Sequence, residues 1–99
     1  MARPVPIRTQ QAATQIGEHL AAWRKLLGLT TQQVAERAGI TRQTVSRLER
    51  GDLSVGIGIF LNVARALGVL DDLVKAADPY ETSFGRARAD QQLPQRVRR

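Results

Sequence analysis

The stretch TQQVAERAGITRQTVSRLERG, residues 31–51, contains two short helical patterns on either side of one glycine. Each pattern carries an apolar stripe at helical spacing, formed by Val34, Ala35 and Ala38 and then by Val45 and Leu48. Gly39 lies between them and can take the positive φ that a sharp turn between crossing helices needs. Thr30, followed by Gln33, and then Thr41 are good N-caps for the two helices. The stretch therefore predicts a helix-turn-helix.

The outward face of the second helix is polar. With Val45 at the centre of the buried side, a helical wheel places Gln43, Ser46, Arg47 and Arg50 opposite, with Arg42 at the flank. These side chains suit the reading of a DNA groove, because arginine can form two hydrogen bonds to guanine and glutamine two to adenine. An ordinary solvated helix face is the alternative. The small and apolar framework at the junction, with Ala35, Gly39 and Ile40, favours groove reading.

The segment from Ile16 to Leu73 resembles the lambda-repressor-like (Cro/Xre-type) helix-turn-helix family. The resemblance rests on Ile16, Leu20, Arg24, Leu27-Gly28-Leu29-Thr30, Val34-Ala35, Ala38-Gly39-Ile40, Val45-Ser46, Leu48-Glu49, Gly51 and Ala64-Arg65-Ala66-Leu67-Gly68. It implies an all-α, five-helix domain with DNA contacts by Thr31, Gln32, Thr41, Arg42, Gln43, Thr44, Ser46, Arg47 and Arg50. The sequence departs from many members at Thr31, where they have a glutamine that contacts the DNA backbone.

The resemblance also implies two further contacts. In the family, the counterparts of Arg24 and Glu49 commonly form an ion pair, which here would tie the first helix to the second helix of the motif. The fifth helix lies near the dimer interface in related repressors, and its apolar residues here are Leu70, Leu73, Val74 and Ala77. We therefore expect a homodimer that binds the major groove of double-stranded DNA at an inverted repeat.

The 99 residues allow one domain, predicted over 14–77 between a flexible N-terminal arm, 1–13, and a basic, partly disordered C-terminal tail, 78–99. Lys and Arg number 15 against 9 Asp and Glu, and the excess is spread over all three parts, at 2 over 0, 8 over 6 and 5 over 3. The net charge of +6 favours a polyanionic partner, although many basic proteins bind none.

Three further helices are predicted outside the motif. The first runs from Thr14 to Leu27 with a stripe of Ile16, Leu20, Trp23 and Leu27, in which Trp23 fills the core or a groove. The others run over residues 57–67 and 70–77. In the tail, Tyr80 and Phe84 allow docking on the domain or a partner, and the arginines allow contact with flanking phosphates. The last ten residues are expected to be disordered.

No enzymatic constellation is visible in the sequence. Cysteine is absent and the single histidine, His19, is predicted to lie on the surface, so neither a Ser/His/Asp nor a Cys/His set can be assembled. No metal and no cofactor is expected. The N-terminus has no run resembling a signal peptide and no apolar stretch reaches membrane-spanning length, so no membrane association is expected. A cytoplasmic location, at the nucleoid when bound to DNA, is the default expectation.

The sequence thus predicts a sequence-specific DNA-binding transcriptional regulator, most simply a repressor. A HipB-like antitoxin is the first alternative, because a small domain with a short basic tail also resembles the DNA-binding partners of HipA-type kinase toxins. A protein-interaction module that has lost DNA binding is the second, and Arg42, Gln43 and Arg47 argue against it. A nonspecific nucleic-acid binder is the third, and it would need no well-formed reading helix.

Overall fold

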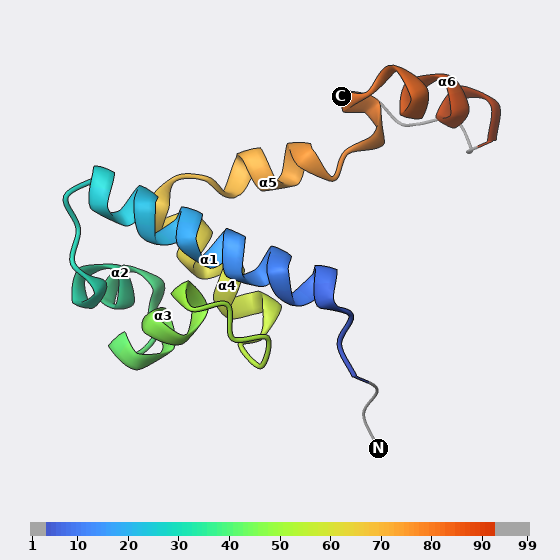
Figure 1. The fold of residues 1–99 in the computed structure, drawn as a ribbon. Helices are drawn as coiled ribbons and strands as arrows, with labels where there is room; N and C mark the ends of the chain where they lie inside the picture. Colours follow the sequence, from blue (N-terminus) through green and yellow to red (C-terminus); the bar gives the residue numbers. More distant parts are fainter. Residues whose placement is uncertain (1–3, 93–99) are drawn as a thin grey trace.

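The computed structural model describes residues 4–92, which form six α-helices, one 3₁₀ helix and no strand (Figure 1). The elements are α1 (Ile7–Leu26), α2 (Thr31–Ala38), α3 (Arg42–Glu49), α4 (Ile57–Leu67), α5 (Leu70–Ala76), η1 (Pro79–Glu81) and α6 (Ser83–Gln92). Helices α1 to α4 lie together, whereas α5 and α6 extend away from them (Figure 1). The all-α prediction is confirmed. The predicted five-helix domain corresponds to α1 to α5, and the tail contributes a sixth α-helix that was not predicted.

The helix-turn-helix is formed by α2 and α3, and both helices begin at the predicted threonines. Thr30 Oγ1 accepts the Gln33 N–H at 3.0 Å, and Gln33 Oε1 accepts the Thr30 N–H at 2.9 Å, so the predicted capping box is confirmed. Thr41 Oγ1 accepts the Thr44 N–H at 3.2 Å at the start of α3. Gly39 ends α2 with φ 71°, a conformation that a side chain would strain.

The core lies where α2, α3 and α4 meet the middle of α1. Its buried residues are Leu20, Val34, Ala35, Ala38, Val45, Leu48, Val63 and Leu67. The apolar stripes predicted within the motif therefore form the core. Ala35 has no exposed surface, so a larger side chain there would have to displace its neighbours.

The crossing of α1 over the end of α3 depends on Gly17. A Cβ at this position would lie 2.7 Å from the Leu48 carbonyl oxygen and 2.5 Å from that of Glu49, so the two backbones are in direct contact. Gly51, just after α3, repeats the arrangement, since its Cβ would lie 2.7 Å from Thr14 Cα. These two glycines fix α1 against both α3 and the loop that follows it.

The apolar stripe predicted along α1 is buried only at its centre. Leu20 is 4% exposed, whereas Ile16, Trp23 and Leu27 are 42%, 45% and 49% exposed. Trp23 therefore does not fill the core, and the alternative, that it fills a groove, stays a prediction. Gly17 and Leu20 are the buried residues of α1, so the other helices cover only a narrow strip at its middle.

The N-terminal boundary of α1 also differs from the prediction. The helix begins at Ile7 rather than Thr14, so residues 7–13, predicted as part of a flexible arm, are helical. Residues 1–3 lie outside the described part. The side chain of Gln10 donates to the Gly51 carbonyl oxygen at 3.1 Å and so attaches this first part of the helix to the domain. A polar contact of this kind leaves no apolar periodicity in the sequence, which is why the start was missed.

The tail, predicted to be partly disordered, contains η1 and α6. Gly85 is buried in α6, and a Cβ there would collide with the Pro79 carbonyl group, so this glycine lets α6 pack on η1. Its N–H donates to Thr82 Oγ1 at 2.9 Å. The predicted disorder of the last ten residues is wrong for 90–92, the end of α6, and residues 93–99 lie outside the described part. The Cα radius of gyration, 16.5 Å against about 13 Å for a compact domain of this length, reflects the extended α5–α6 region.

We predict that Gly17→Ala destabilises the protein because the new methyl group meets two carbonyl oxygens that belong to the backbone of α3. Overpacking of this kind costs about 1–3 kcal/mol, and each kcal/mol lowers the Tm of a domain of this size by about 4–8 °C. Gly58→Ala is the matched control, since nothing lies within 4 Å of a Cβ there and its φ is not positive. It should leave the Tm unchanged or raise it. Equal Tm values for the two variants in thermal unfolding would show that the close crossing is absent.

Candidate nucleic-acid interface

The outward face of α3 and the start of α2 form one open surface depression. Burial of Val45 and Leu48 turns the opposite side of α3 to solvent, as the helical wheel predicted. Six of the nine predicted DNA-contacting residues line the depression: Thr31, Arg42, Gln43, Ser46, Arg47 and Arg50. Three of the six are arginines, so a polyanion would meet concentrated positive charge here.

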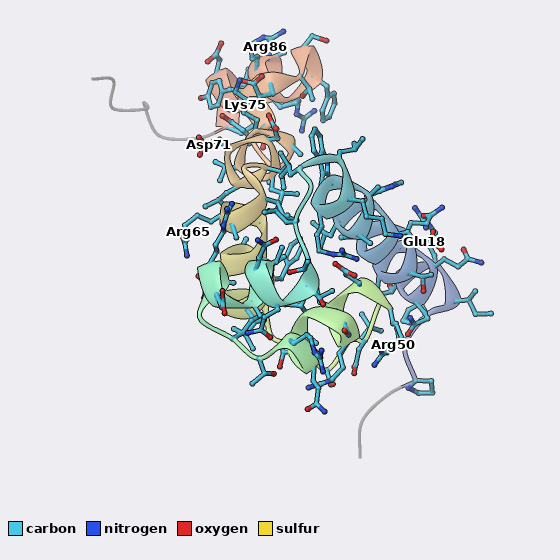
Figure 2. The ribbon with its side chains drawn as sticks, turned by 90° about the vertical axis from the view of Figure 1, so that its left-hand side faces the viewer. Glu18, Arg50, Arg65, Asp71, Lys75 and Arg86 are labelled. Atoms are coloured by element: carbon cyan, nitrogen blue, oxygen red, sulfur yellow. The ribbon has the colours of Figure 1, made fainter. Side chains whose placement is uncertain are left out.

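The side chains of Arg42, Gln43 and Arg50 are exposed and have no hydrogen-bond acceptor or donor among residues 4–92. Their N–H groups are therefore available to a ligand. Figure 2 shows Arg50 at the end of the molecule formed by α2 and α3, far from Asp71, Lys75 and Arg86 on α5 and α6. The candidate interface thus belongs to the helix-turn-helix alone.

The other three predicted residues lie at the edge of this surface. Thr41 and Thr44 are occupied with capping α3, since their hydroxyl oxygens are 2.8 Å apart and Thr41 accepts the Thr44 N–H. Gln32 is exposed on α2, outside the depression, and donates to Glu36 Oε2 at 3.2 Å. These side chains position the helices or lie beside the depression rather than in it.

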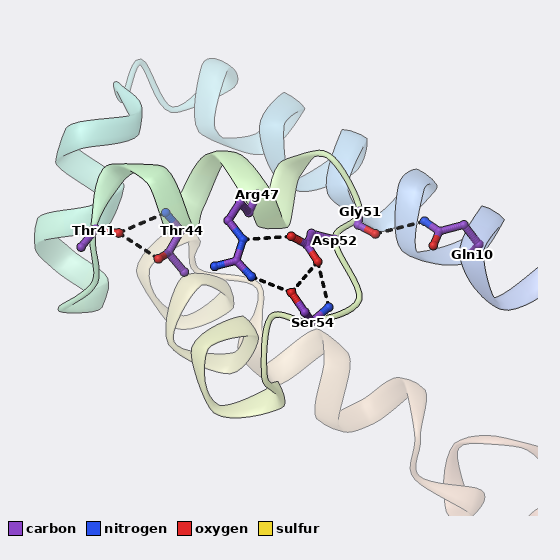
Figure 3. Close-up of polar contacts among 7 residues, drawn as sticks. All are labelled: Gln10, Thr41, Thr44, Arg47, Gly51, Asp52 and Ser54. Atoms are coloured by element: carbon purple, nitrogen blue, oxygen red, sulfur yellow. Dashed lines mark hydrogen bonds and ion pairs between the residues drawn. The ribbon is translucent and has the colours of Figure 1, made fainter. Parts of the chain in front are cut away.

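Arg47 is the one arginine of the depression that is already engaged within the chain (Figure 3). Its Nε donates to Asp52 Oδ2 at 2.9 Å, and its Nη2 donates to Ser54 Oγ at 2.6 Å. The Ser54 hydroxyl and N–H in turn donate to Asp52 Oδ1 at 2.7 and 2.9 Å. We call these three residues the Arg47 cluster.

Hydrogen bonds from Ser54, and then from Arg47, hold the pKa of the Asp52 carboxyl group well below its usual range. Asp52 therefore remains ionised far below neutral pH. Sequence reasoning missed Asp52 and Ser54 because they lie between the predicted helices, outside the helix-turn-helix motif. The order Asp-x-Ser directly after a helix-ending glycine was the available signal, since an Asp side chain commonly accepts a backbone N–H two residues on.

A second ion pair holds α3 against α1. Arg24 Nε and Nη2 donate to the two carboxylate oxygens of Glu49 at 2.8 and 3.2 Å, and Arg24 Nη1 donates to the Leu29 carbonyl oxygen at 3.1 Å. Each side chain is only 14% exposed. The hydrogen bond to Glu49 raises the pKa of Arg24 against the opposing effect of burial. The structure thus brings together the two partners that the family resemblance implied.

The apolar residues predicted on α5 lie away from this site. Leu70 and Leu73 are half-buried, Val74 is 63% exposed, and Ala77, just after the helix, is exposed. No residue of α5 is fully buried. The helix therefore presents apolar surface that residues 4–92 leave uncovered.

Comparison with known proteins shows which family the chain belongs to. Residues 15–77 match the family described as a helix-turn-helix domain, which covers more than half of the chain. The chain belongs to the helix-turn-helix domain family. The match includes all of α2 to α5, with the depression and the Arg24–Glu49 pair.

Several relatives of this helix-turn-helix protein carry the name uncharacterised HTH-type transcriptional regulator. One, from Methanothermobacter thermautotrophicus, is 49% identical over 55 residues, 56% of this chain and 74% of the relative. Another, from Sinorhizobium fredii, is 38% identical over 71 residues, 71% of this chain and 90% of the relative. No solved structure matches significantly.

Metal sites and membrane-spanning helices each need a recognisable arrangement of residues. Within residues 4–92, no three His, Asp or Glu side chains are grouped as a metal site would require. None of the helices in this range is long and apolar enough to cross a membrane.

We predict that Arg24→Ala lowers the Tm clearly, because it removes three hydrogen bonds and leaves the Glu49 carboxylate mostly buried without its partner. The loss should lie between the ~1 kcal/mol of an exposed pair and the ~3–5 kcal/mol of a fully buried one. Arg37→Ala is the matched control, since Arg37 is exposed and its side chain has no partner in the described chain. Equally small shifts for the two variants in thermal unfolding would mean that water fully solvates the pair.

Proposed function

We propose that this helix-turn-helix protein is a sequence-specific DNA-binding transcriptional regulator that acts as a repressor. The observation that carries the proposal is the polar depression on α2 and α3, with three arginines and a glutamine projecting from a firmly packed helix. The names of its relatives agree with this function.

The dimensions and chemistry of α3 suit the major groove. An α-helix with its side chains is about 10–12 Å across, and the groove is about 12 Å wide. Gln43 and Arg47 carry the side-chain types that form paired hydrogen bonds with adenine and guanine. Arg42, Arg50 and the start of α2 at Thr31 would contact phosphates and so fix the register of the helix.

A nonspecific nucleic-acid binder is the less favoured function. Such a protein needs only positive charge, whereas the depression also contains Gln43, Ser46 and Thr31, which are neutral. The mostly buried Arg24–Glu49 pair and the close contact at Gly17 hold α3 in one orientation, which sequence reading requires and charge attraction does not.

We predict that Gln43→Ala relaxes the DNA sequence preference at one or two positions, costing ~1–3 kcal/mol at the preferred site. Selection from random double-stranded DNA measures the preference, and Gln11→Ala, an exposed glutamine on α1, is the control. Enrichment of no motif by the natural chain would refute sequence-specific binding. An unchanged motif for Gln43→Ala would show that this residue does not read the DNA sequence.

The affinity for DNA should also depend on the salt concentration. If 6–10 phosphates are contacted, affinity should fall by roughly 10³–10⁵ between 50 and 200 mM salt.

The protein is proposed to act as a homodimer through α5. A helix of seven residues is too short to be stable on its own, yet α5 has no fully buried residue and Val74 is exposed. A second copy related by a two-fold axis would cover Leu70, Leu73, Val74 and Ala77. Because α5 lies far from Arg50, this contact leaves the depression open (Figure 2).

We predict that Val74→Asp makes the protein monomeric, because it places a charge in the dimer contact while the side chain is already solvated in the single chain. Lys75→Ala is the control, since it changes the net charge by the same amount at the next position. Light scattering after size exclusion reports the mass, and footprinting should show two half-sites ~10–10.5 bp apart only for the dimer. A natural chain that is monomeric and binds one asymmetric site would contradict this part of the proposal.

An antitoxin role is the alternative within the same fold, with a HipA-type kinase toxin as the partner. The exposed Phe84 on α6, a helix that packs on η1 rather than on the core, supports a protein contact by the tail. A kinase that co-purifies with the full chain, and is lost after truncation at Asp78 with the DNA motif intact, would establish this role. Absence of such a protein from the native host would exclude it.

A further inference from the structure

The Arg47 cluster distinguishes one arginine of the depression from the others. Arg42 and Arg50 have no acceptor in the described chain, whereas Arg47 is bound by Asp52 and Ser54 from the loop between α3 and α4 (Figure 3). The loop places a carboxylate beside a surface that is otherwise positive. A carboxylate in this position would repel DNA phosphates and weaken DNA binding, so its presence here calls for an explanation.

The contacts occupy one edge of the guanidinium group and leave another free. Of the five N–H groups, the one on Nε donates to Asp52 and one on Nη2 donates to Ser54. No acceptor among residues 4–92 lies within hydrogen-bond distance of Nη1. The remaining N–H groups therefore lie on Nη1 and Nη2, the pair that can meet two acceptors at once.

Contacts with the backbone of α3 and with α1 also hold the Arg47 cluster in place. The Asp52 N–H donates to the Arg47 carbonyl oxygen at 3.1 Å, which closes the loop back on α3. Gly51 lies against the backbone of α1 at Thr14, and its carbonyl oxygen accepts the Gln10 side chain at 3.1 Å (Figure 3). The carboxylate of Asp52 is thus fixed relative to the helix that carries Arg47.

We propose that Asp52 and Ser54 are positioning residues that hold Arg47 so that its Nη1 and Nη2 groups meet O6 and N7 of one guanine. This inference rests on the proposed DNA-binding function and adds the base that one residue recognises. A free arginine side chain loses much rotamer freedom on binding, and a side chain already held in its bound form loses less. Asp52 therefore increases discrimination at one base pair, while its charge reduces affinity for every sequence alike.

Asp52 is expected to raise base discrimination and to lower the affinity for DNA of any sequence. These opposite effects make the inference testable with the full-length chain. Selection from random double-stranded DNA is carried out with the natural chain and with Arg47→Ala, Asp52→Asn, Ser54→Ala and the Arg47→Ala/Asp52→Asn double variant. Asp90→Asn, an exposed position on α6, controls for the loss of one negative charge, and Ser54→Ala tests positioning without any charge change. Thermal unfolding checks that each variant is folded.

The natural chain and Asp90→Asn should select a motif with one guanine that Arg47→Ala loses, with a preference of roughly 5- to 150-fold. Asp52→Asn and Ser54→Ala should weaken the preference for this guanine, while Asp52→Asn binds unrelated DNA as tightly as the natural chain or more tightly. In the double variant, Asp52→Asn should add no further loss of selectivity, since it acts through Arg47.

Three results would overturn the inference. If Asp52→Asn and Ser54→Ala keep or sharpen the guanine preference, the cluster only withholds Arg47 from DNA. If Arg47→Ala changes no position of a clear motif, Arg47 is not a reader, although the proposed function stands. If the natural chain enriches no motif, the proposed function fails and this inference fails with it.

Discussion

The contact between α1 and the C-terminal end of α3 is the constraint on which the rest of the structure depends. Gly17 lets the two backbones meet, and the Arg24–Glu49 pair joins the same two helices by charge-assisted hydrogen bonds at 2.8 and 3.2 Å. Because Val45 and Leu48 are buried beneath this crossing, the orientation of α3 about its own axis is fixed. A helix with a fixed orientation presents the same side chains to every ligand.

The same contact extends from the core to the surface that we propose as the DNA interface. Gly51 continues the close approach of α1 to the loop after α3, and Asp52 and Ser54 carry it to the guanidinium group of Arg47. A chain of packed backbone and hydrogen bonds therefore leads from α1 to one candidate base-reading side chain. Arg42 and Arg50 lie outside this chain of contacts, which fits side chains that adapt to phosphates rather than select a base.

The sequence allowed good prediction wherever the structure depends on apolar periodicity, capping or glycine conformation. The capping box at Thr30, the positive φ of Gly39 and the bounds of α4 followed from such local signals. The start of α1, the packing of α6 on η1 and the Arg47 cluster did not, because each rests on polar or backbone contacts between segments. Gly17 was detectable in principle, since a glycine inside a helix costs up to about 1 kcal/mol and so often marks a close backbone approach.

The most direct test of DNA reading by α3 is an NMR titration of the uniformly ¹⁵N-labelled full-length chain with a duplex obtained by selection. Amide signals of residues 41–50 and of Thr31, together with the side-chain Nε signal of Arg47, should show the largest shifts. Signals of α6 should remain in place, since this helix lies far from the proposed interface (Figure 2). Shifts confined to α5 and α6, with α3 unaffected, would contradict the claim that the outward face of α3 reads DNA.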